Sequence, residues 1–453
     1  MANEGAFAGQ KPRISVIGLG KLGSRMAAVF ASKGYQVVGY DLVESNVRAI
    51  NEGRAPVLET GLQAMLDQSE GRLRATIDVK DAIHSSDVSF IIVPTPSDKT
   101  GIFSNRFVLA AVNEIGRVLR AKDGFHIVVV TSTVVPGSTG GEIQKALEET
   151  SGRKVGRDVG LCYNPEFIAL GSVVHDMLHP DFILIGESDA VSGSVLERIY
   201  SSTCSNNPPI QRMNLVNAEI TKISVNTFVT TKISYANMVA EVCEKLPGAD
   251  ASVVTYAIGT DSRIGRKYLR GATGYGGPCF PRDNKAFAAI GRSLGVQCAL
   301  AEATDATNDH QLERLSKLVE ENLRPGARIV VLGLSYKPET NVVEESQGVG
   351  LSRLLAERGF FVTVYDPLAN DSAAAALGDS VICAPSLAEA VRSGDLLIVM
   401  TAWPQFAEIT GHMLGREAVV IIDPWRVVNP AKFGSSTRVI HPGRGPVSVA
   451  TEK

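Results

Sequence analysis

The chain alternates short apolar runs with longer stretches in which apolar residues recur at helical spacing, an order that is typical of α/β proteins. From Arg13, an apolar run leads into a glycine-rich turn, an amphipathic stretch follows, and a second apolar run ends at Asp41. Further apolar runs that predict strands lie at residues 89–96, 126–134, 158–167 and 182–187. Strands that alternate with helices in this way predict a parallel, doubly wound sheet.

The turn after the first apolar run has the spacing of a dinucleotide-binding site. Its glycines are Gly18, Gly20 and Gly23, and Asp41 lies 23 positions after Gly18. Glycines permit a tight turn and the close approach of a pyrophosphate to a helix N-terminus, whose N–H groups favour anions. A carboxylate at this spacing accepts a hydrogen bond from a ribose hydroxyl and repels a 2′-phosphate. The pattern therefore predicts NAD as the cofactor rather than NADP.

Two hydroxyl side chains and one carboxylate follow the next predicted strands. Thr95 and Thr133 come at the ends of two apolar runs, and Glu166 lies in the loop after another. Ligands of doubly wound sheets bind outside the carboxyl ends of the strands. We therefore expect both threonines at the cofactor site.

A long helix is predicted in the middle of the chain. Residues 214–246 contain neither glycine nor proline, and Pro247-Gly248 ends the run. This predicts one helix of about 30 residues, although many β-branched residues weaken the tendency. Glu219, Lys222 and Asn226 fall on one face of that helix. A solvated polar stripe is the alternative, but the apolar neighbours of Lys222 and Asn226 favour a partly buried face.

The C-terminal third of the chain repeats the pattern of the first third. Residues 16–20, 34–41 and 81–96 match residues 331–335, 359–366 and 389–404, with offsets a little over three hundred. A second doubly wound unit is therefore expected. The second and third glycines of the phosphate turn are missing from it, so we expect it to bind a different nucleotide and not a second NAD.

One stretch between the two units predicts chemistry. Gly274–Asp283 contains three glycines, two prolines and a cysteine, a composition that predicts a tight loop rather than a helix or strand. A thiolate on such a loop is open to a substrate, and the nearby Arg282 favours the charged, nucleophilic form of Cys279. The alternative is that Cys279 is a small buried hydrophobic residue.

The composition of the chain argues against several classes of function. The chain has 453 residues, 44% hydrophobic and 21% charged residues and a net charge of −3, which argues against nucleic acid or an anionic membrane as the main partner. No apolar run approaches the roughly 20 residues that span a bilayer, and residues 1–12 read as a disordered leader rather than a signal peptide. The six cysteines (162, 204, 243, 279, 298 and 383) form no CxxC pair and no zinc-like spacing, so we expect reduced thiols, no metal site and a cytoplasmic location.

Six of these stretches, in this order, resemble motifs of the UDP-glucose/GDP-mannose dehydrogenase family, whose members oxidise the C6 alcohol of a nucleotide sugar to a carboxylate with NAD. They are GLGKLG, STVVPG, NPEF, KISVN, GYGGPCFPRD and GLSYKPET, and the resemblance runs from Arg13 to about Arg426. It implies two doubly wound Rossmann-like domains of the α/β class, joined by a long central helix.

The resemblance also implies roles for individual residues. Cys279 is the expected nucleophile, which forms a thiohemiacetal and then a thioester, and Glu166 is expected to act in acid–base steps. Lys222 and Asn226 would hold an oxyanion, while Asp283 and Thr133 would position water. A thiolate, an ammonium and an amide are the groups that such an oxidation needs.

The remaining site residues implied by the resemblance bind the cofactor or the substrate. The expected cofactor-binding residues are Gly18, Gly20, Leu22, Gly23, Asp41, Pro94, Thr95 and Thr133. The expected substrate-binding residues are Phe167, Lys222, Asn226, Arg263, Tyr268, Gly276, Lys337 and Arg426. Among the latter, Arg263 would reach the sugar bound to a neighbouring subunit, whereas Lys337 and Arg426 would lie near the uridine diphosphate.

Three departures from the family pattern affect specificity. Leu170 stands where the family usually has a glutamate, and Glu344 stands where it usually has an arginine. The first leaves the exact sugar open and the second leaves cofactor affinity open. The segment DPWR also replaces the usual DGR, which affects the role of Arg426.

We predict four parts: the leader 1–12, an NAD-binding domain 13–210, a central helical dimerisation and catalytic-loop region 211–315, and a nucleotide-sugar (UDP) binding domain 316–453. The predicted function is NAD-dependent oxidation of UDP-glucose to UDP-glucuronate by a homodimer or higher homo-oligomer. The same chemistry on a UDP-N-acetylhexosamine or GDP-mannose, and a catalytically silent NAD- or nucleotide-sensing protein, are the alternatives.

Overall fold

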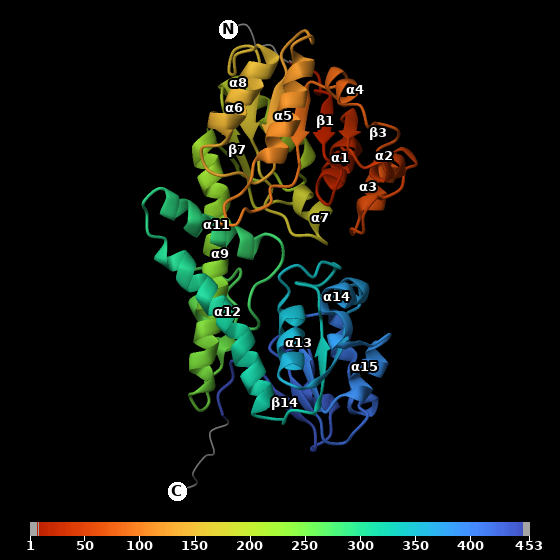
Figure 1. Ribbon diagram of the computed structural model, residues 1–453, viewed down its shortest axis with the longest axis vertical. Coiled ribbons are helices and arrows are strands. Elements are labelled where there is room, and N and C mark those ends of the chain that lie inside the picture. The colour runs from red at the N-terminus through yellow and green to blue at the C-terminus, as the bar shows by residue number, and fades with distance from the viewer. Residues whose placement is uncertain (1–6, 8, 447–453) are drawn as a thin grey trace. The chain divides into compact units, whose positions relative to one another are not determined.

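The computed structural model describes Phe7 and residues 9–446 (Figure 1). The chain forms two compact units, Met1–Ser224 and Val225–Lys453. The predicted disordered leader falls largely on residues outside the described part of the chain. The predicted boundaries at residues 210 and 315 remain predictions.

The first unit is built on an eight-stranded sheet with the strand order β3-β2-β1-β4-β5-β6-β7-β8. Neighbouring strands are parallel, except that β6 and β7 are antiparallel. The strands are β1 (Ile14–Ile17), β2 (Val37–Tyr40), β3 (Leu73–Thr76), β4 (Val88–Ile91), β5 (Ile127–Val130), β6 (Gly160–Tyr163), β7 (Ile183–Glu187) and β8 (Ile210–Asn214). The predicted strands are thus present, and several of the predicted site residues follow their carboxyl ends.

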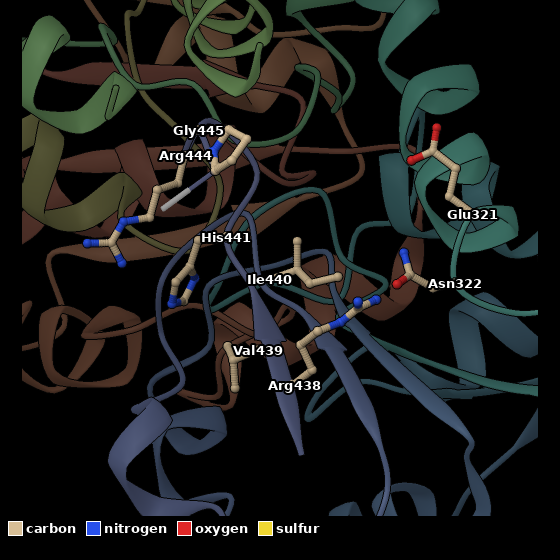
Figure 2. A pocket seen from close by; sticks show the side chains of 9 residues that line it. Glu321, Asn322, Arg438, Val439, Ile440, His441, Arg444 and Gly445 are labelled. Carbon is tan, nitrogen blue, oxygen red and sulfur yellow. The ribbon is translucent and has the colours of Figure 1, made fainter. Parts of the chain in front are cut away.

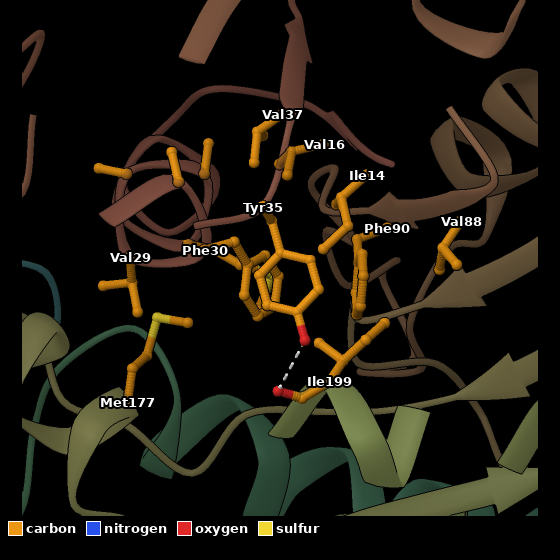
Figure 3. Close-up of a cluster of buried hydrophobic side chains, with 14 of the residues drawn as sticks. Ile14, Val16, Val29, Phe30, Tyr35, Val37, Val88, Phe90, Met177 and Ile199 are labelled. Carbon is orange, nitrogen blue, oxygen red and sulfur yellow. Dashed lines mark hydrogen bonds between the residues drawn. The ribbon is translucent and has the colours of Figure 1, made fainter. Parts of the chain in front are cut away.

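Helices cover both faces of this sheet because alternate strand residues point to opposite sides. Ile127 and Val129 belong to one apolar cluster, and Val128 and Val130 belong to the other. Figure 3 shows the first cluster, in which Phe30 and Phe90 pack together. On its side lie α1 (Gly23–Ser32), α3 (Leu62–Gln68), α7 (Val173–Leu178) and α8 (Ala190–Thr203).

The opposite face of the sheet is covered by α4 (Val79–His84), α5 (Arg106–Leu119) and α6 (Gln144–Ser151), the last preceded by the π-helical turn η1 (Thr139–Ile143). In α5 the buried residues include Val108, Val112, Ile115 and Leu119, which recur every three or four positions. This spacing places them on one side of a helix. Helix α2 (Glu44–Asn51) follows β2.

The long helix predicted between residues 214 and 246 is confirmed as α9 (Leu215–Glu244), 30 residues long. Its polar residues Glu219, Lys222 and Asn226 are buried, with 0%, 6% and 7% of their surface exposed. The solvated-stripe alternative is therefore excluded.

The second unit contains a parallel six-stranded sheet with the order β11-β10-β9-β12-β13-β14. Its strands are β9 (Arg328–Leu332), β10 (Phe361–Tyr365), β11 (Ile382–Cys383), β12 (Leu396–Val399), β13 (Val420–Ile422) and β14 (Arg438–Ile440). The helices are α10 (Ala251–Ile258), α11 (Phe280–Ser293), α12 (Ala299–Glu320), α13 (Gln347–Glu357), α14 (Asn370–Leu377) and α15 (Leu387–Ser393). The prediction of two doubly wound α/β units joined by a long central helix is therefore confirmed.

The prediction that Gly274–Asp283 is a loop throughout is wrong in its second half. Residues 274–278 are irregular, but α11 begins at Phe280, and Pro281 lies in its first turn. Proline is tolerated there because the first N–H groups of a helix have no intrahelical partner.

Among the described residues, no helix is long and apolar enough to cross a membrane.

Candidate active site

The cofactor turn follows β1, and its glycines serve different purposes. Gly18 has φ of +100°, and a Cβ there would lie 2.2 Å from the carbonyl oxygen of Ile92. A Cβ on Gly23 would lie 1.8 Å from the carbonyl oxygen of Gly18. At Gly20, in contrast, nothing lies within 4 Å of an added Cβ. With Leu22 as the N-cap of α1, the turn leaves open space at a helix N-terminus, where a pyrophosphate fits.

Asp41 follows β2 and supports the same turn. Its Oδ2 accepts a hydrogen bond from the backbone N–H of Leu19 at 2.6 Å, and its Oδ1 accepts one from Val43 at 2.8 Å. The side chain remains half-buried. Each oxygen of a carboxylate can accept more than one bond, so Asp41 keeps acceptor capacity for a ribose hydroxyl.

The loops after β4 and β5 are tied to each other. The hydroxyl of Ser132 accepts from the N–H of Val93 at 2.9 Å and lies 2.7 Å from the carbonyl oxygen of Val93. Beside Ser132 lies the half-buried Thr133, and close to Val93 are the exposed Pro94 and the buried Thr95. Because β4 and β5 are parallel neighbours, both predicted threonines lie at the same edge of the sheet.

Glu166 follows β6, at the same edge. The phenolic oxygen of Tyr200 lies 3.0 Å from its Oε1. The charge of Lys222 and the bond to Tyr200 favour the ionised form, but desolvation by the surrounding protein outweighs both and raises the pKa of Glu166 to about 7. A carboxyl group with such a pKa can exchange a proton at neutral pH.

Lys222 is joined to the same loop. Its Nζ donates to the backbone carbonyl oxygen of Glu166 at 2.7 Å and lies 4.6 Å from the centre of the Phe167 ring. The amine is thereby held beside Glu166 by the backbone and by a cation–π contact.

Glu219, one turn before Lys222, joins the segment after β5 to α9. Its two carboxylate oxygens accept from the backbone N–H groups of Gly137 at 2.5 Å and Thr139 at 2.7 Å. Burial raises the pKa of Glu219, although these bonds favour its charged form. The sequence placed Glu219 on the same face as Lys222, but the partner loop could not be read from spacing.

In the second unit, Cys279 is exposed and is the N-cap residue of α11. N–H groups at a helix N-terminus stabilise a thiolate. The neighbouring Arg282 supports this state: burial lowers the pKa of its guanidinium, but the charges of Asp283, Cys279 and Glu344 and the hydrogen bond to Asp283 together raise it. Among the described residues, no disulfide involves any of the six cysteines.

Asp283 and Asn226 meet in the same unit. Asp283 is fully buried, and its Oδ2 accepts from the Nδ2 of Asn226 at 2.6 Å. Its Oδ1 accepts from Nε and Nη2 of Arg282 at 3.0 and 2.9 Å. Both oxygens of the predicted water-positioning carboxylate are therefore engaged by protein groups.

The glycines before Cys279 pack closely on the loop that follows β9. The N–H of Gly277 donates to the carbonyl oxygen of Glu344 at 3.0 Å. A Cβ on Gly276 would lie 2.3 Å from the carbonyl oxygen of Glu345, and one on Gly277 would lie 2.5 Å from the ring of Tyr336. The position of the cysteine loop is therefore set in part by the loop after β9.

The turn after β9 differs from the cofactor turn in an unexpected way. Pro338 stands at the spacing of the third glycine, as predicted, but Gly348 makes the equivalent contact, because a Cβ there would lie 2.2 Å from the carbonyl oxygen of Gly333. This is the contact that Gly23 makes with Gly18. Gly348 lies fifteen residues after Gly333 instead of five, so a longer loop separates strand and helix. The second glycine is indeed replaced, by Ser335.

The acid after β10 is unlike Asp41. Oδ2 of Asp366 lies within 3.1 Å of four donors, namely the N–H groups of Leu334 and Ser335, the hydroxyl of Ser335 and Nε1 of Trp403. Its Oδ1 accepts from two more N–H groups, and only 1% of the residue is exposed. Asp366 has little capacity left for a ribose, which agrees with the expectation of a different nucleotide.

The predicted substrate residues of this unit are spread over several loops. Arg426 pairs with both oxygens of Asp250 at 2.9 and 2.7 Å, so a diphosphate would have to compete with that carboxylate. Lys337 is half-buried. Arg263 is 87% exposed beside Asp261, and the exposed Tyr268 lies edge-on to Phe280.

A surface pocket of about 570 Å³ lies beside β14 (Figure 2). Arg438, His441 and Arg444 line it together with Glu321 and Asn322. None of the described residues that line it belongs to the predicted site.

The predicted residues thus form two sets. One unit brings together the cofactor turn, Asp41, the two threonines, Glu166 and Lys222. The other brings together Asn226, Asp283 and the loop of Cys279. Three family models match in the same order, namely the NAD binding domain at residues 12–204, the central domain at 216–310 and the UDP binding domain at 330–430. The chain belongs to the UDP-glucose/GDP-mannose dehydrogenase family.

Full-length relatives support this membership. The UDP-glucose 6-dehydrogenase AglM of Haloferax volcanii is 36% identical over 92% of this chain and 97% of its own length. The UDP-glucose 6-dehydrogenase TuaD of Bacillus subtilis is 35% identical over 88% and 85%. The GDP-mannose 6-dehydrogenase of Pseudomonas putida is 34% identical over 78% and 80%.

Solved structures show the same architecture. A UDP-glucose dehydrogenase from Pyrobaculum islandicum superposes with a TM-score of 0.88 at 36% identity, covering 96% of this chain and 98% of that one. A UDP-D-ManNAc dehydrogenase from Pyrococcus horikoshii gives a TM-score of 0.81 at 26% identity, covering 95% and 99%.

The cofactor of this family is NAD, and the residues of the first unit fit it. The open space at Gly20 and the N–H groups of α1 suit the pyrophosphate, and the carboxylate of Asp41 suits a ribose hydroxyl. The chain is accordingly an NAD-dependent dehydrogenase of the nucleotide-sugar class.

Proposed function

We propose that this chain oxidises the C6 alcohol of UDP-glucose to the carboxylate of UDP-glucuronate. Two relatives at 36% and 35% identity are named UDP-glucose 6-dehydrogenases, and the matched length is greater for them than for the GDP-mannose relative. NAD, when bound, accepts the hydride in each of the two oxidation steps. The residues of the chain hold the sugar, move the protons and carry the covalent intermediate.

In the first step, a base takes the proton of the C6 hydroxyl while a hydride leaves C6, which gives an aldehyde. Glu166 suits the acid–base role, because its pKa is raised to about 7. Lys222, whose Nζ is held beside the Glu166 loop, suits the stabilisation of the developing alkoxide.

In the second step, the thiolate of Cys279 adds to the aldehyde carbon and forms a thiohemiacetal. Loss of a hydride from that carbon gives a thioester, and water releases the carboxylate and regenerates the thiol. Asn226 and Asp283, which are hydrogen-bonded to each other, are proposed to orient the oxyanion and the water. Lys222 and Asn226 lie one turn apart on α9.

The observation that carries this proposal is the place of Cys279, exposed at the N-terminus of α11 beside Arg282. The test is the amount of NADH formed per sugar, with the product identified by mass, for the unmodified chain and for Cys279→Ala. We expect two NADH and the uronate from the former, and no uronate from the latter. Uronate formation by the alanine variant near the unmodified rate would refute the thioester mechanism, whereas no NADH from the unmodified chain with any nucleotide sugar would favour the catalytically silent sensor.

The identity of the sugar is tested separately, with UDP-glucose, UDP-N-acetylhexosamines and GDP-mannose compared by kcat/KM. Leu170 packs against the first apolar cluster, in contrast to the glutamate that the resemblance led us to expect. If the chain prefers an N-acetylated sugar or GDP-mannose, that sugar replaces UDP-glucose as the proposed substrate, and the reaction class stays the same. We also propose a homodimer or higher homo-oligomer located in the cytoplasm.

A further inference from the structure

A chain of three polar side chains, of which Asn164 and Tyr200 are buried, ends at the half-buried Glu166. Tyr200 lies on α8, with 1% of its surface exposed, and its ring packs edge-on to Phe30 at 6.1 Å in the first apolar cluster. Its phenolic oxygen lies 2.5 Å from Oδ1 of Asn164 and 3.0 Å from Oε1 of Glu166. The phenol therefore has two oxygen neighbours but only one proton to donate.

The orientation of Asn164 decides where that proton goes. Nδ2 of Asn164 lies 2.9 Å from the backbone carbonyl oxygen of Leu184, which can only accept a hydrogen bond. The amide nitrogen must therefore face Leu184, and the amide oxygen must face Tyr200. Asn164 is 1% exposed, so water does not replace Tyr200 as a donor to this oxygen. The proton of Tyr200 is thus required by Asn164.

The consequence falls on Glu166. With its proton given to Asn164, the oxygen of Tyr200 presents lone pairs to Oε1 of Glu166, and the 3.0 Å contact is a hydrogen bond only if Glu166 donates. If Glu166 loses its proton, the phenol proton can turn to the carboxylate, but Asn164 then loses its buried donor. We infer that Asn164 and Tyr200 form a hydrogen-bond chain that holds a proton on Glu166.

The other groups near Glu166 also influence whether its carboxyl group is protonated or ionised. Lys222 favours the ionised form through its positive charge, whereas desolvation favours the neutral form. The thiol of Cys204 lies near the same carboxyl group, and burial raises its pKa to about 11, so it is neutral at working pH. A hydrogen bond donated by Tyr200 would favour the ionised form of Glu166, as Lys222 does. With its proton given to Asn164, Tyr200 accepts from Glu166 instead, so the chain adds to desolvation and opposes Lys222. Asn164 and Tyr200 are positioning residues, since they act through Glu166.

This inference rests on the proposed acid–base role of Glu166 only for its effect on turnover. The state of the proton itself can be measured without substrate. The carbonyl stretch of a protonated carboxyl group is followed by infrared difference spectroscopy over a pH series, and Glu166→Gln identifies the band. The pH dependence of kcat/KM is recorded in parallel.

The decisive variants are Asn164→Ala and Asn164→Asp, each also made with Tyr200→Phe. Both changes at Asn164 remove the donor to Leu184, but only alanine removes the acceptor for Tyr200. With Tyr200 free to donate to Glu166, Asn164→Ala should lower the pKa of Glu166 by about one unit. Asn164→Asp should not lower it, and in the Tyr200→Phe background Asn164→Ala should have no effect.

An equal shift from Asn164→Ala in both backgrounds, or no shift in either, would overturn the inference. If the alanine variant does not fold, Asn164→Asp alone tests the inference: it keeps the acceptor for Tyr200, so the pKa of Glu166 should stay the same or rise, and a lowered pKa would overturn the inference. A pKa that moves as expected while the pH dependence of kcat/KM stays unchanged would support the hydrogen-bond chain and contradict the acid–base role of Glu166.

Discussion

Replacing Gly277 by alanine tests whether the loop after β9 positions the nucleophile. Gly277 has φ of +85°, and a Cβ there would lie 2.5 Å from the ring of Tyr336. An ordinary contact begins at 3.4 Å, so the ring or the cysteine loop must shift by about 1 Å. A displacement of that size at a reacting group can lower the rate by about 100-fold. We therefore expect Gly277→Ala to lower kcat by about 10- to 100-fold.

The matched control is Gly295→Ala, just after α11. Gly295 has a similar φ of +72°, but nothing lies within 4 Å of an added Cβ. Both variants carry the strain of a left-handed alanine, about 1–2 kcal/mol, and both should unfold at lower urea. Only Gly277→Ala should lose turnover, measured as NADH formation on the folded protein. Equal kcat values for the two variants would contradict the positioning of Cys279 by this contact.

Four further predictions concern the cofactor, the chemistry, the assembly and pH. Turnover with NADP should be at least about tenfold slower than with NAD, and Asp41→Ala should reduce this difference in rate. Equal rates with the two cofactors for the unmodified chain would show that Asp41 does not discriminate against NADP. Lys222→Ala should lower kcat by about 100-fold, and normal kcat with a raised KM would make Lys222 a binding residue. Light scattering should give a dimer or a multiple of it, because exposed Phe228 and Tyr235 continue an apolar face along α9; a fully active monomer would exclude this. Glu166→Gln should stabilise the fold by about 3 kcal/mol at pH 8.5 and by much less at pH 5. The reason is that ionising a carboxyl group with a folded pKa of about 7 destabilises the folded state as pH rises through that value. A pH-independent difference in urea unfolding between the two proteins would contradict the raised pKa.

The sequence predicted the elements whose pattern is local. The apolar runs predicted strands β1, β2 and β4 to β7, and the absence of glycine and proline predicted α9 to within two residues at each end. The shared face of Glu219 and Lys222 was also predictable, because helical spacing is regular. Local patterns are sufficient where a single element decides the geometry.

The partners of those residues could not be predicted in the same way. Tyr200 lies 34 positions after Glu166 and Glu219 lies 80 after Thr139, so both contacts join elements that are far apart in the sequence. The start of α11 was missed for a different reason, since three glycines and two prolines outweigh the helical tendency of the residues after Pro281. A proline in the first turn is as typical of a helix start as of a loop.

The two sheets use the same strand–turn–helix plan in opposite ways, and the acid after the second strand explains the difference. In the first unit, Asp41 accepts one hydrogen bond from the turn and stays half-buried, while Gly20 leaves room for a pyrophosphate. In the second unit, Ser335 takes the place of the second glycine, and its hydroxyl joins three other donors on one oxygen of Asp366.

An acid that is saturated by its own turn stabilises the loop but cannot recognise a ribose. The longer loop before Gly348 then becomes available for another purpose, since the backbone of Glu344 and the ring of Tyr336 hold the glycines that precede Cys279. Compared with the cofactor turn, the turn after β9 therefore lacks one glycine and is ten residues longer, and it supports the proposed nucleophile instead of a cofactor. This explains why a repeated fold in one chain does not imply a repeated ligand.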